Sequence, residues 1–461
     1  MKLLFISANE EWLPDPVPPI GVAYVAAAAR EDGHVCTLFD CNFHPVEDAL
    51  AKELIAFQPD VIALSIRNVD NAAFPVAVSY LENYQRIARV CHDTCPEIPL
   101  VLGGSAFSLF PERFLELLDG DYGIVGEGEN LLRALLRSLE EEGEPAPNRN
   151  PGAHGDPRIY YNTELEANPG RIWPARDLMD VERYFQQGGS INIQTKRGCA
   201  YGCAYCTYPL LEGVRIRQHP PAEVVDEIEF CFDRFGVDYF FFVDSVFNLP
   251  GQHAVAIAEE ILRRQLKIRW TAYMSPARTT EAMFAVFREA GCMSADFGTD
   301  AASGQPLSAL NKSFDVEEIK NCSRWCRESG IKFNHSLLFG APGETRESIE
   351  ETIETISLCQ PTAVTVFIGV RLYPGTPLTR QLVGEGWIPE ERIDLQPVFY
   401  VEEGVREYLL ERINEVADRN PNWIVPGLRK QMNEPFFRRV RARGVKGPLW
   451  ELLPDVRRRR R

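Results

Sequence analysis

The chain has 461 residues, of which 45% are hydrophobic and 25% charged, the mixture of an ordinary globular protein. This composition excludes collagen-like, low-complexity and disordered proteins. The formal net charge of −17 argues against nucleic acid as a main partner, because the phosphate backbone attracts basic surfaces. No apolar run approaches the roughly 20 residues that a transmembrane helix needs.

The twelve cysteines are too few for a disulfide scaffold in a chain of this length. The first residues carry one lysine and no small-residue cleavage site, so we expect no secretory signal. Both observations favour a protein of the reducing cytoplasm.

Short β-rich runs alternate with amphipathic helical patterns over the first part of the chain. The expected strands are Lys2–Ser7, Val35–Asp40, Val61–Ser65, Leu100–Leu102 and Tyr122–Val125. Strands separated by helices form βαβ units, which build a doubly wound parallel sheet and bind ligands beyond the carboxyl ends of the strands. At those ends the sequence places small residues, namely Ser65, Gly103, Gly104, Gly126 and Gly128.

A stretch rich in Pro, Gly and Asn follows, and a second alternating region comes after it. Its expected strands are Ile191–Thr195, Tyr239–Val243, Arg269–Ala272, Ala295–Gly298, Lys332–Leu338 and Val364–Gly369. Six β/α repeats predict a partial (β/α)6, TIM-like barrel with functional residues at the strand C-termini.

The sequence thus predicts an α/β protein of four parts. Residues 1–145 would form a Rossmann-like domain, 146–189 a linker and 190–390 the partial barrel. Residues 391–461 would form a small, mostly helical region that caps the substrate site and ends in a basic tail, Arg457–Arg461. That tail could attract an anionic substrate or partner, although a solvated terminus is the simpler interpretation.

The strongest chemical signal is the segment KRGCAYGCAYC, which contains Cys199, Cys203 and Cys206. Three thiolates in one short loop, next to Gly198 and Gly202, suit a single inorganic centre. Iron–sulfur clusters usually take four thiolates, so three leave one iron open to a substrate or cofactor. Zinc is the competing metal, but structural zinc takes four closed ligands, and no second cysteine pair follows at zinc-finger spacing.

The cysteine motif, with an aromatic residue before its last cysteine, resembles that of the radical S-adenosylmethionine (SAM) superfamily. FFFVDSVFN, GTDAASGQPLSALNKS, LFGAPGET and RLYPGTPL follow it in the order that these enzymes show. The first region resembles the cobalamin-binding domain often fused ahead of them, through PPIGVAYVAAAAREDGH, PDVIALS, VLGG and GEGE. Up to about residue 390, the chain is similar to the class B, cobalamin-dependent radical SAM enzymes.

This resemblance implies that the three cysteines ligate a [4Fe–4S] cluster whose fourth iron binds SAM. It also implies SAM contacts from Tyr205, Asp244, Asp300, Lys312, Gly340 and Pro342. Asp300 departs from the family pattern, because GTDAAS stands where Gly-Ile-Glu-Ser is more usual. Helix capping is the alternative role for Asp244 and Asp300, and a solvated surface charge is the alternative for Lys312.

The resemblance further implies a cobalamin site at the strand ends of the first region. Its residues would be Ser65, Arg67, Asn68, Gly103, Gly104, Gly126, Glu127 and Gly128. The Asp-x-His-x-x-Gly motif that gives cobalt a histidine ligand is absent, and Asp40 with His44 is the nearest approach. We therefore expect cobalamin bound without a histidine ligand, the alternative being a domain that binds nothing.

As a member of such a family, the chain would cleave SAM reductively to a 5′-deoxyadenosyl radical. It would then methylate an unactivated carbon of a small-molecule or lipid-like substrate through methylcobalamin. The alternatives are a radical SAM cyclase or isomerase that uses cobalamin differently or not at all, and a non-catalytic cobalamin-sensing protein. The expected partners are the substrate and an electron donor such as flavodoxin or ferredoxin; no catalytic acid or base is indicated.

Overall fold

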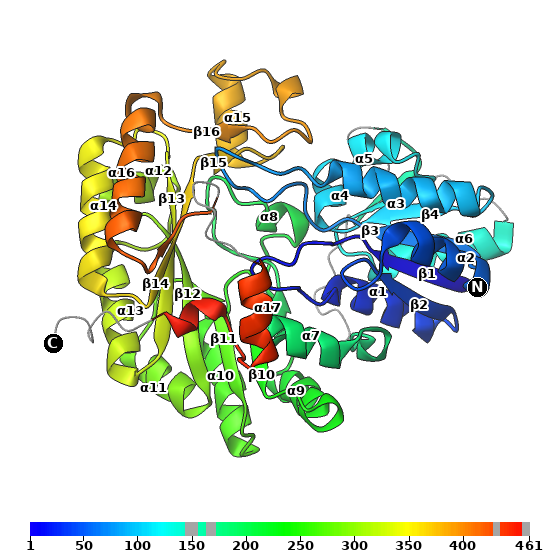
Figure 1. Cartoon of the computed structure of the whole chain (residues 1–461), viewed down its shortest axis with the longest axis horizontal. Coiled ribbons are helices and arrows are strands. Elements are labelled where there is room, and N and C mark those ends of the chain that lie inside the picture. Colours follow the sequence, from blue (N-terminus) through cyan, green and yellow to red (C-terminus); the bar gives the residue numbers. More distant parts are fainter. Residues whose placement is uncertain (143–154, 163–171, 427–433, 454–461) are drawn as a thin grey trace.

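Two α/β units lie side by side in the computed structural model (Figure 1). The structure describes residues 1–142, 155–162, 172–426 and 434–453. The predicted tail Arg457–Arg461 and most of the predicted linker before residue 172 lie outside these ranges. Within the described residues, no helix is both long and apolar enough to cross a membrane.

The first unit is built on a six-stranded sheet in the order β2-β1-β3-β4-β5-β6, with every pair parallel. Its strands are β1 (Lys2–Ser7), β2 (Val35–Asp40), β3 (Val61–Ser65), β4 (Leu100–Gly103), β5 (Tyr122–Val125) and β6 (Ile159–Tyr161). The strand order reverses between β1 and β3, which makes the sheet doubly wound, as predicted. The sixth strand comes from residues expected to form a linker.

Helices cover both faces of this sheet, because its strands are apolar on both sides. On one face, α1 (Ile20–Glu31) and α6 (Glu129–Glu142) pack with strand residues such as Leu3 and Val101. The other face is covered by α2 (Ala51–Phe57), α3 (Leu81–Thr94), α4 (Ser105–Leu109) and α5 (Pro111–Leu117).

The second unit is built on a seven-stranded parallel sheet in the order β7-β10-β11-β12-β13-β14-β17. Its strands are β7 (Ile191–Ile193), β10 (Tyr239–Phe242), β11 (Arg269–Met274), β12 (Cys292–Asp300), β13 (Lys332–Phe339), β14 (Ala363–Ile368) and β17 (Trp423–Ile424). The six predicted strands are confirmed, and β7 and β17 remain at the two edges, so the barrel is partial. The short strand β17 was not expected.

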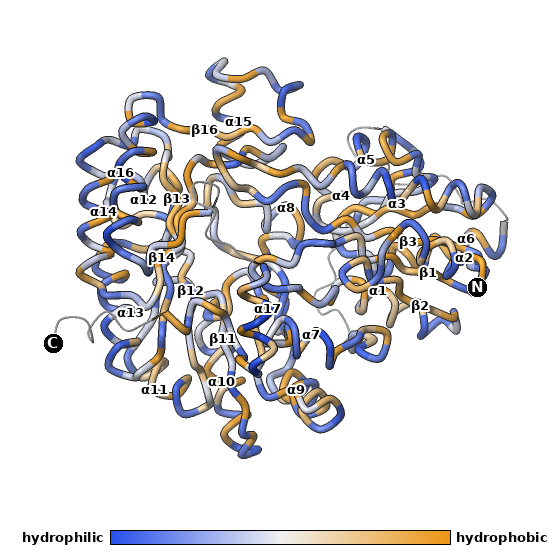
Figure 2. Tube along the Cα trace, in the orientation of Figure 1, coloured by the Kyte–Doolittle hydropathy of each residue, from blue (hydrophilic) through white to orange (hydrophobic). Residues whose placement is uncertain are grey.

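Amphipathic helices lie along the outer side of the second sheet (Figure 1). They are α9 (Pro221–Phe235), α10 (Gly251–Arg263), α11 (Glu281–Glu289), α13 (Val316–Ser329), α14 (Arg346–Cys359) and α16 (Arg406–Arg419). In Figure 2 these helices alternate between apolar and polar colours along their length, as expected where one face packs on a sheet. Phe240, Trp270 and Phe297 belong to the resulting core.

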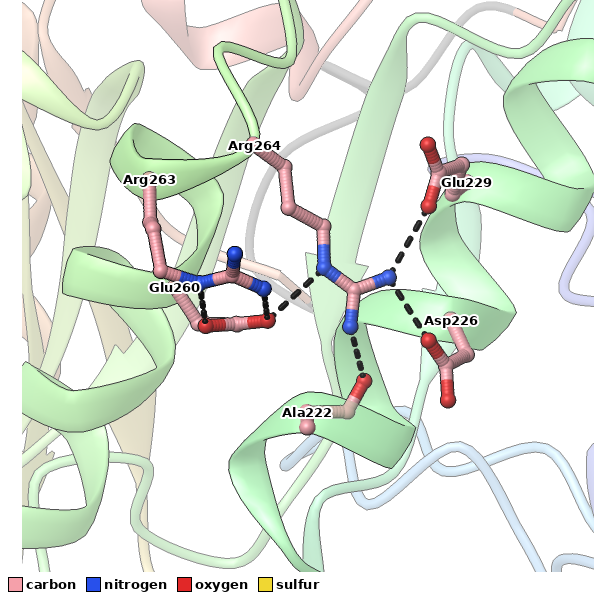
Figure 3. Close-up of polar contacts among 6 residues, drawn as sticks. All are labelled: Ala222, Asp226, Glu229, Glu260, Arg263 and Arg264. Atoms are coloured by element: carbon pink, nitrogen blue, oxygen red, sulfur yellow. Dashed lines mark hydrogen bonds and ion pairs between the residues drawn. The ribbon is translucent and has the colours of Figure 1, made fainter.

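A charged network also ties neighbouring outer helices together (Figure 3). Arg264, at the end of α10, donates to Asp226 at 2.6 Å and to Glu229 at 2.9 Å, both on α9. Its other donors reach Glu260 of α10 at 2.8 Å and the carbonyl oxygen of Ala222 at 2.8 Å. One guanidinium therefore fixes the spacing of two helices.

The last part of the chain contacts both units. Between β14 and α16 lie α15 (Pro377–Gly384) and an antiparallel pair, β15 (Val370–Arg371) with β16 (Phe399–Tyr400). The helix α17 (Glu434–Ala442), which was not expected, packs on α7 (Val181–Gly188). Its Arg441 donates to both carboxylate oxygens of Asp15, at 2.7 and 2.8 Å.

Ion pairs join the first unit to the second. Arg371 Nε lies 3.0 Å from Asp70 Oδ2, and the two side chains are 5% and 0% exposed. Arg113 and Asp394 form a more open pair at 3.2 Å, with side chains that are 45% and 35% exposed. The buried pair is the stronger link, because removal of either partner leaves a buried charge without compensation.

We expect Asp70→Asn to lower the free energy of unfolding by about 3–5 kcal/mol, because it strands the Arg371 charge. The matched change at the open pair, Asp394→Asn, should cost about 1 kcal/mol or less. Urea unfolding of the two variants beside the unaltered chain measures both values. Equal effects would contradict the assignment of Asp70–Arg371 as the dominant link.

Candidate functional site

The cysteine loop leaves the carboxyl end of β7 through a small antiparallel pair, β8 (Lys196–Arg197) with β9 (Arg217–Gln218). Gly198 follows β8 with a φ of +89°, and an added Cβ there would collide with the carbonyl oxygen of Arg215. Only glycine fits this turn. Cys199 comes next; it is buried, and its N–H donates to the carbonyl oxygen of Gly213 at 3.1 Å.

Backbone hydrogen bonds clamp the loop between two later segments. The N–H of Ala204 donates to Leu310 O at 3.0 Å, and the N–H of Leu378 in α15 donates to Ala204 O at 2.8 Å. Asn311 Nδ2 donates to Gly202 O at 2.5 Å. Leu310 and Asn311 follow α12 (Gly304–Ala309), so the loop shape depends on contacts about 100 residues away.

The three thiols share a poorly solvated environment. Burial raises the pKa of the Cys206 thiol to about 12, and the neighbouring thiols of Cys203 and Cys199 add to the rise. Protein also raises the pKa of the Cys203 thiol, and a cationic inorganic centre would favour the thiolate form of such crowded sulfurs. No three His, Cys, Asp or Glu side chains within the described ranges converge on one metal-ion position. Side chains must converge on one position only when they bind a single metal ion. In a [4Fe–4S] cluster each cysteine binds a different iron atom.

Three of the residues predicted to contact SAM meet beside this loop. Asp300 Oδ2 accepts hydrogen bonds from Tyr205 Oη at 2.5 Å and from Lys312 Nζ at 2.6 Å. The Lys312 side chain is only 7% exposed, so it is not a solvated surface charge. Asp300 does not cap the next helix either, because Ser303 precedes α12. Burial raises the pKa of the Cys203 thiol, and the charge of Lys312 opposes that rise.

Asp244 instead binds the segment that leads into the cysteine loop. The residue is 1% exposed. Its carboxylate accepts from Thr195 N at 2.7 Å and Oγ1 at 2.5 Å, and from Lys196 N at 3.2 Å and Nζ at 2.8 Å. These four donors occupy the acceptor positions of a carboxylate. The structure therefore places Asp244 as a positioning residue for the segment that leads into the cysteine loop, and the SAM contact predicted for it stays a prediction.

Gly340 and Pro342 lie in a turn that follows β13. Gly340 has a φ of +96°, and its N–H donates to Glu344 Oε2 at 2.5 Å. Pro342 O accepts from Gln305 Nε2 at 3.1 Å. Burial raises the pKa of Glu344 to about 7, and its Oε1 has no hydrogen-bond partner within the described residues. The hydrogen bonds of Gly340, Pro342 and Glu344 thus stabilise the turn itself.

The strand ends predicted to bind cobalamin lie side by side at one edge of the first sheet. Ser65 of β3 is in register with Gly103 of β4. An added Cβ would make only ordinary van der Waals contacts at Gly103, 3.8 Å from Ile124 O, and at Gly126, 3.7 Å from Asn162 Cβ, so neither position is tightly packed. Arg67 is exposed in the loop after β3, and the backbone of neighbouring Asn68 is fixed by Tyr84 Oη, which donates to Asn68 O at 2.6 Å.

Three other members of the predicted cobalamin set have structural partners. An added Cβ at Gly104, whose φ is +103°, would lie 2.5 Å from Ile66 O. Glu127 accepts hydrogen bonds from Arg217 and lies 3.3 Å from Arg197, so it joins the two units. Gly128 packs against Val25 of α1. The glycine at position 104 is therefore required by the backbone itself, whether or not a ligand is bound.

Two tyrosines in the second unit were not predicted from the sequence. Tyr208, which begins α8 (Tyr208–Leu211), and Tyr273 of β11 are 38% and 43% exposed. The surrounding protein nevertheless raises the pKa of Tyr273 to about 12 by desolvation, and it raises the pKa of Tyr208 as well. Arg67 of the first unit lies near both tyrosines, because its charge opposes both rises.

The sequence indicates these two tyrosines only through their positions. Tyr208 stands two positions after Cys206, and Tyr273 alternates with the outward-facing residues of its strand. Nothing local distinguishes such a tyrosine from one that packs in a core.

We expect Gly104→Ala to lower the free energy of unfolding by about 2 kcal/mol, since the new methyl group meets the Ile66 backbone at a positive φ. Gly103→Ala is the matched control, because its added Cβ would lie 3.8 Å from Ile124 O, an ordinary contact, and it should cost about 1 kcal/mol or less. Thermal or urea unfolding measures the difference. A Gly104→Ala variant as stable as Gly103→Ala would show that the two loops can separate freely.

The raised pKa of Glu344 predicts a pH dependence of stability. The folded chain holds this proton more tightly than the unfolded chain, so stability falls as the pH rises from the ordinary glutamate pKa through about 7. Glu344→Gln keeps an acceptor for the Gly340 N–H and should flatten this fall, by roughly 2 kcal/mol between about pH 5 and pH 8. Urea unfolding at both pH values checks it, and an unchanged slope would contradict the prediction.

Two family models match the chain in separate segments. The model described as the B12 binding domain matches residues 13–136, and that described as the radical SAM superfamily matches residues 193–356. The first covers the doubly wound sheet from α1 to α6, and the second covers the cysteine loop and most of the partial barrel.

Similar proteins align over most of the chain. An uncharacterised methyltransferase of Pyrococcus horikoshii is 25% identical over 412 residues, 86% of this chain and 87% of that protein. The anaerobic magnesium-protoporphyrin IX monomethyl ester cyclase of Rubrivivax gelatinosus is 25% identical over 373 residues, 76% of this chain and 65% of the cyclase.

A solved structure shares the fold of the whole chain. The radical SAM methyltransferase TsrM of Kitasatospora setae, with tryptophan substrate and a SAM analogue bound, superposes with a TM-score of 0.85 at 22% identity. The match covers 100% of this chain and 99% of TsrM. The chain thus matches a B12 binding domain followed by a radical SAM domain, the domain order of the cobalamin-dependent radical SAM enzymes that it resembles.

Proposed function

We propose that this chain is a cobalamin-dependent radical SAM methyltransferase that methylates an unactivated carbon of a small-molecule substrate. One observation carries the proposal: Asp300 and Lys312 meet Tyr205 of the cysteine loop, and Arg67 of the first unit lies near Tyr208, two residues after Cys206. A methyl donor held by one unit can then meet a substrate activated in the other.

The cysteine loop provides the donors that a [4Fe–4S] cluster needs. Cys199, Cys203 and Cys206 would ligate three irons, and the clamps on Ala204 and Gly202 would hold the loop shape. When bound, the cluster and SAM supply the radical that activates the substrate carbon, and cobalamin supplies the methyl group.

The carboxylate and ammonium next to the loop are arranged for SAM. Asp300 would accept a hydrogen bond from a ribose hydroxyl, and Lys312 would pair with the SAM carboxylate. Lys312 Nζ donates to Asp300 Oδ2 at 2.6 Å, so the two charges compensate each other without SAM. Tyr205, which donates to the same oxygen, would lie against the adenine.

The first unit would hold cobalamin at the carboxyl ends of β3, β4 and β5. Gly103 and Gly126 are not tightly packed, and Arg67 and Asn68 would provide polar groups in the loop after β3. Ser65 would contribute a hydroxyl at the end of β3. Glu127, Gly104 and Gly128 would shape this edge through their contacts with Arg217, Ile66 and Val25.

A cyclase is the second candidate, because the Rubrivivax enzyme with that activity aligns with 76% of this chain. The mass of the product separates the two reactions, since methylation adds a CH2 unit and cyclisation does not. A lipid-like substrate is also compatible with the proposal. A flavodoxin or ferredoxin in the cytoplasm would supply the electron.

We expect Cys203→Ala to lose most of its iron and its ability to consume SAM, while cobalamin still binds the other unit. The test is anaerobic purification with iron, sulfide and hydroxocobalamin, followed by metal analysis and the absorption spectrum. Cys95→Ala is the control, because this half-buried cysteine lies in the first unit, away from the loop. Full iron content in Cys203→Ala, or stoichiometric iron without cobalt in the unaltered chain, would contradict the proposal.

A further inference from the structure

The inner face of the partial barrel carries a polar group that the cofactors do not explain. Asp296 lies in the middle of β12, between Ala295 and Phe297, which pack outward into the core. Its Oδ1 accepts from Asn334 Nδ2 at 2.9 Å and from Ser336 Oγ at 3.0 Å, both on β13. Two neighbouring strands thus hold the carboxylate in one orientation.

The second oxygen of this carboxylate is free. No described residue donates a hydrogen bond to Asp296 Oδ2, and no Lys, Arg or His of the described ranges forms an ion pair with it. By contrast, Asp244 is paired with Lys196, and Asp70 with Arg371. Asp296 is half-buried, and an uncompensated carboxylate is costly where protein displaces water; desolvation raises its pKa to about 6.

Open space leads to this oxygen. Gly298 is two residues further along β12, on the same face of the strand, and an added Cβ there would meet no atom within 4 Å. Tyr273 stands opposite Asp296 in register and is 43% exposed. Asp300, beside the cysteine loop, is four residues further along β12, past an irregularity between Gly298 and Asp300.

The walls of this space are aromatic. The rings of Phe241 on β10 and Tyr273 on β11 are 4.8 Å apart between centroids and tilted by 50°. Aromatic faces attract cations as well as flat apolar groups. A fixed carboxylate at the base of aromatic walls is complementary to a positively charged nitrogen carried on a planar or apolar body.

We propose that Asp296 anchors the substrate through a cationic nitrogen group, an ammonium or a guanidinium, bound at its free oxygen inside the partial barrel. This inference rests on the proposed function and narrows its substrate class. The cation would restore the missing countercharge, and Asn334 and Ser336 would keep the carboxylate aimed at it. Asp296 is then a specificity residue that fixes which carbon faces the cofactors.

The test uses the purified full-length chain and matched pairs of small probes. Tryptamine, phenethylamine and benzamidine carry the cation, and tryptophol, phenethyl alcohol and benzamide are their neutral counterparts. Ligand-observed NMR titration compares the unaltered chain with Asp296→Asn, which keeps the size and the acceptor oxygen. Asp238→Asn removes a carboxylate that lies outside the inner face and is already paired with Arg269, and it serves as the control.

We expect the cationic probes to bind the unaltered chain more tightly than their counterparts, and to lose about tenfold or more in affinity in Asp296→Asn. The neutral probes should be unaffected by that change, and Asp238→Asn should leave both classes unchanged. Absence of a cation preference in the unaltered chain, or its persistence in Asp296→Asn, would overturn the proposal.

A second variant tests the proposal independently, in case Asp296→Asn does not fold. Gly298→Val leaves the carboxylate in place but fills the open space, so it should weaken both probe classes; unchanged cation binding would overturn the proposal. Iron and cobalt contents of the same samples are measured separately. Their absence from the unaltered chain would reject the cofactor proposal while leaving the cation test intact.

Discussion

A buried ion pair holds the functional edges of two parallel sheets against each other. Asp70 lies in the loop after β3 of the first sheet, Arg371 belongs to β15, which follows β14 of the second sheet, and their side chains are almost wholly shielded from water. Arg67 lies three residues before Asp70, so the pair also helps to place the cation that lies near Tyr208 and Tyr273. Glu127 adds a second link, through Arg217 next to the cysteine loop. Any chemistry shared between the units depends on this alignment.

Charge balance separates residues that support the site from those that can bind a ligand. Asp244 accepts from four donors, one of them the ammonium of Lys196, so its acceptor positions are occupied within the fold. Asp300 and Lys312 satisfy each other at a single contact, which a ligand with both a hydroxyl and a carboxylate can replace without stranding a charge. Among the described residues, the half-buried Asp296 has no countercharge, and a cationic ligand would supply one.

The predicted glycines divide in the same way. At Gly104 and Gly198 the backbone takes a positive φ next to another carbonyl oxygen, so no side chain fits with or without a ligand. At Gly103 an added Cβ would meet no atom closer than 3.8 Å, and at Gly298 it would meet none within 4 Å. Only the second kind makes room for a cofactor or substrate, and the two kinds look alike in the sequence.

The sequence by itself determined the order of strands and helices, both parallel sheets and the cysteine motif, because alternation of apolar residues and ligand spacing are local properties. It did not predict β17, α17 or the strand β6, which are short or follow irregular segments and form through contacts with distant elements. Nor could it predict that Glu127 bridges the units, that Asp244 is saturated, or that Asp296 faces open space beside Tyr273. Those roles were decided only by the tertiary structure, because the partners of a charged side chain come from segments far apart in the chain and determine whether its charge is already compensated.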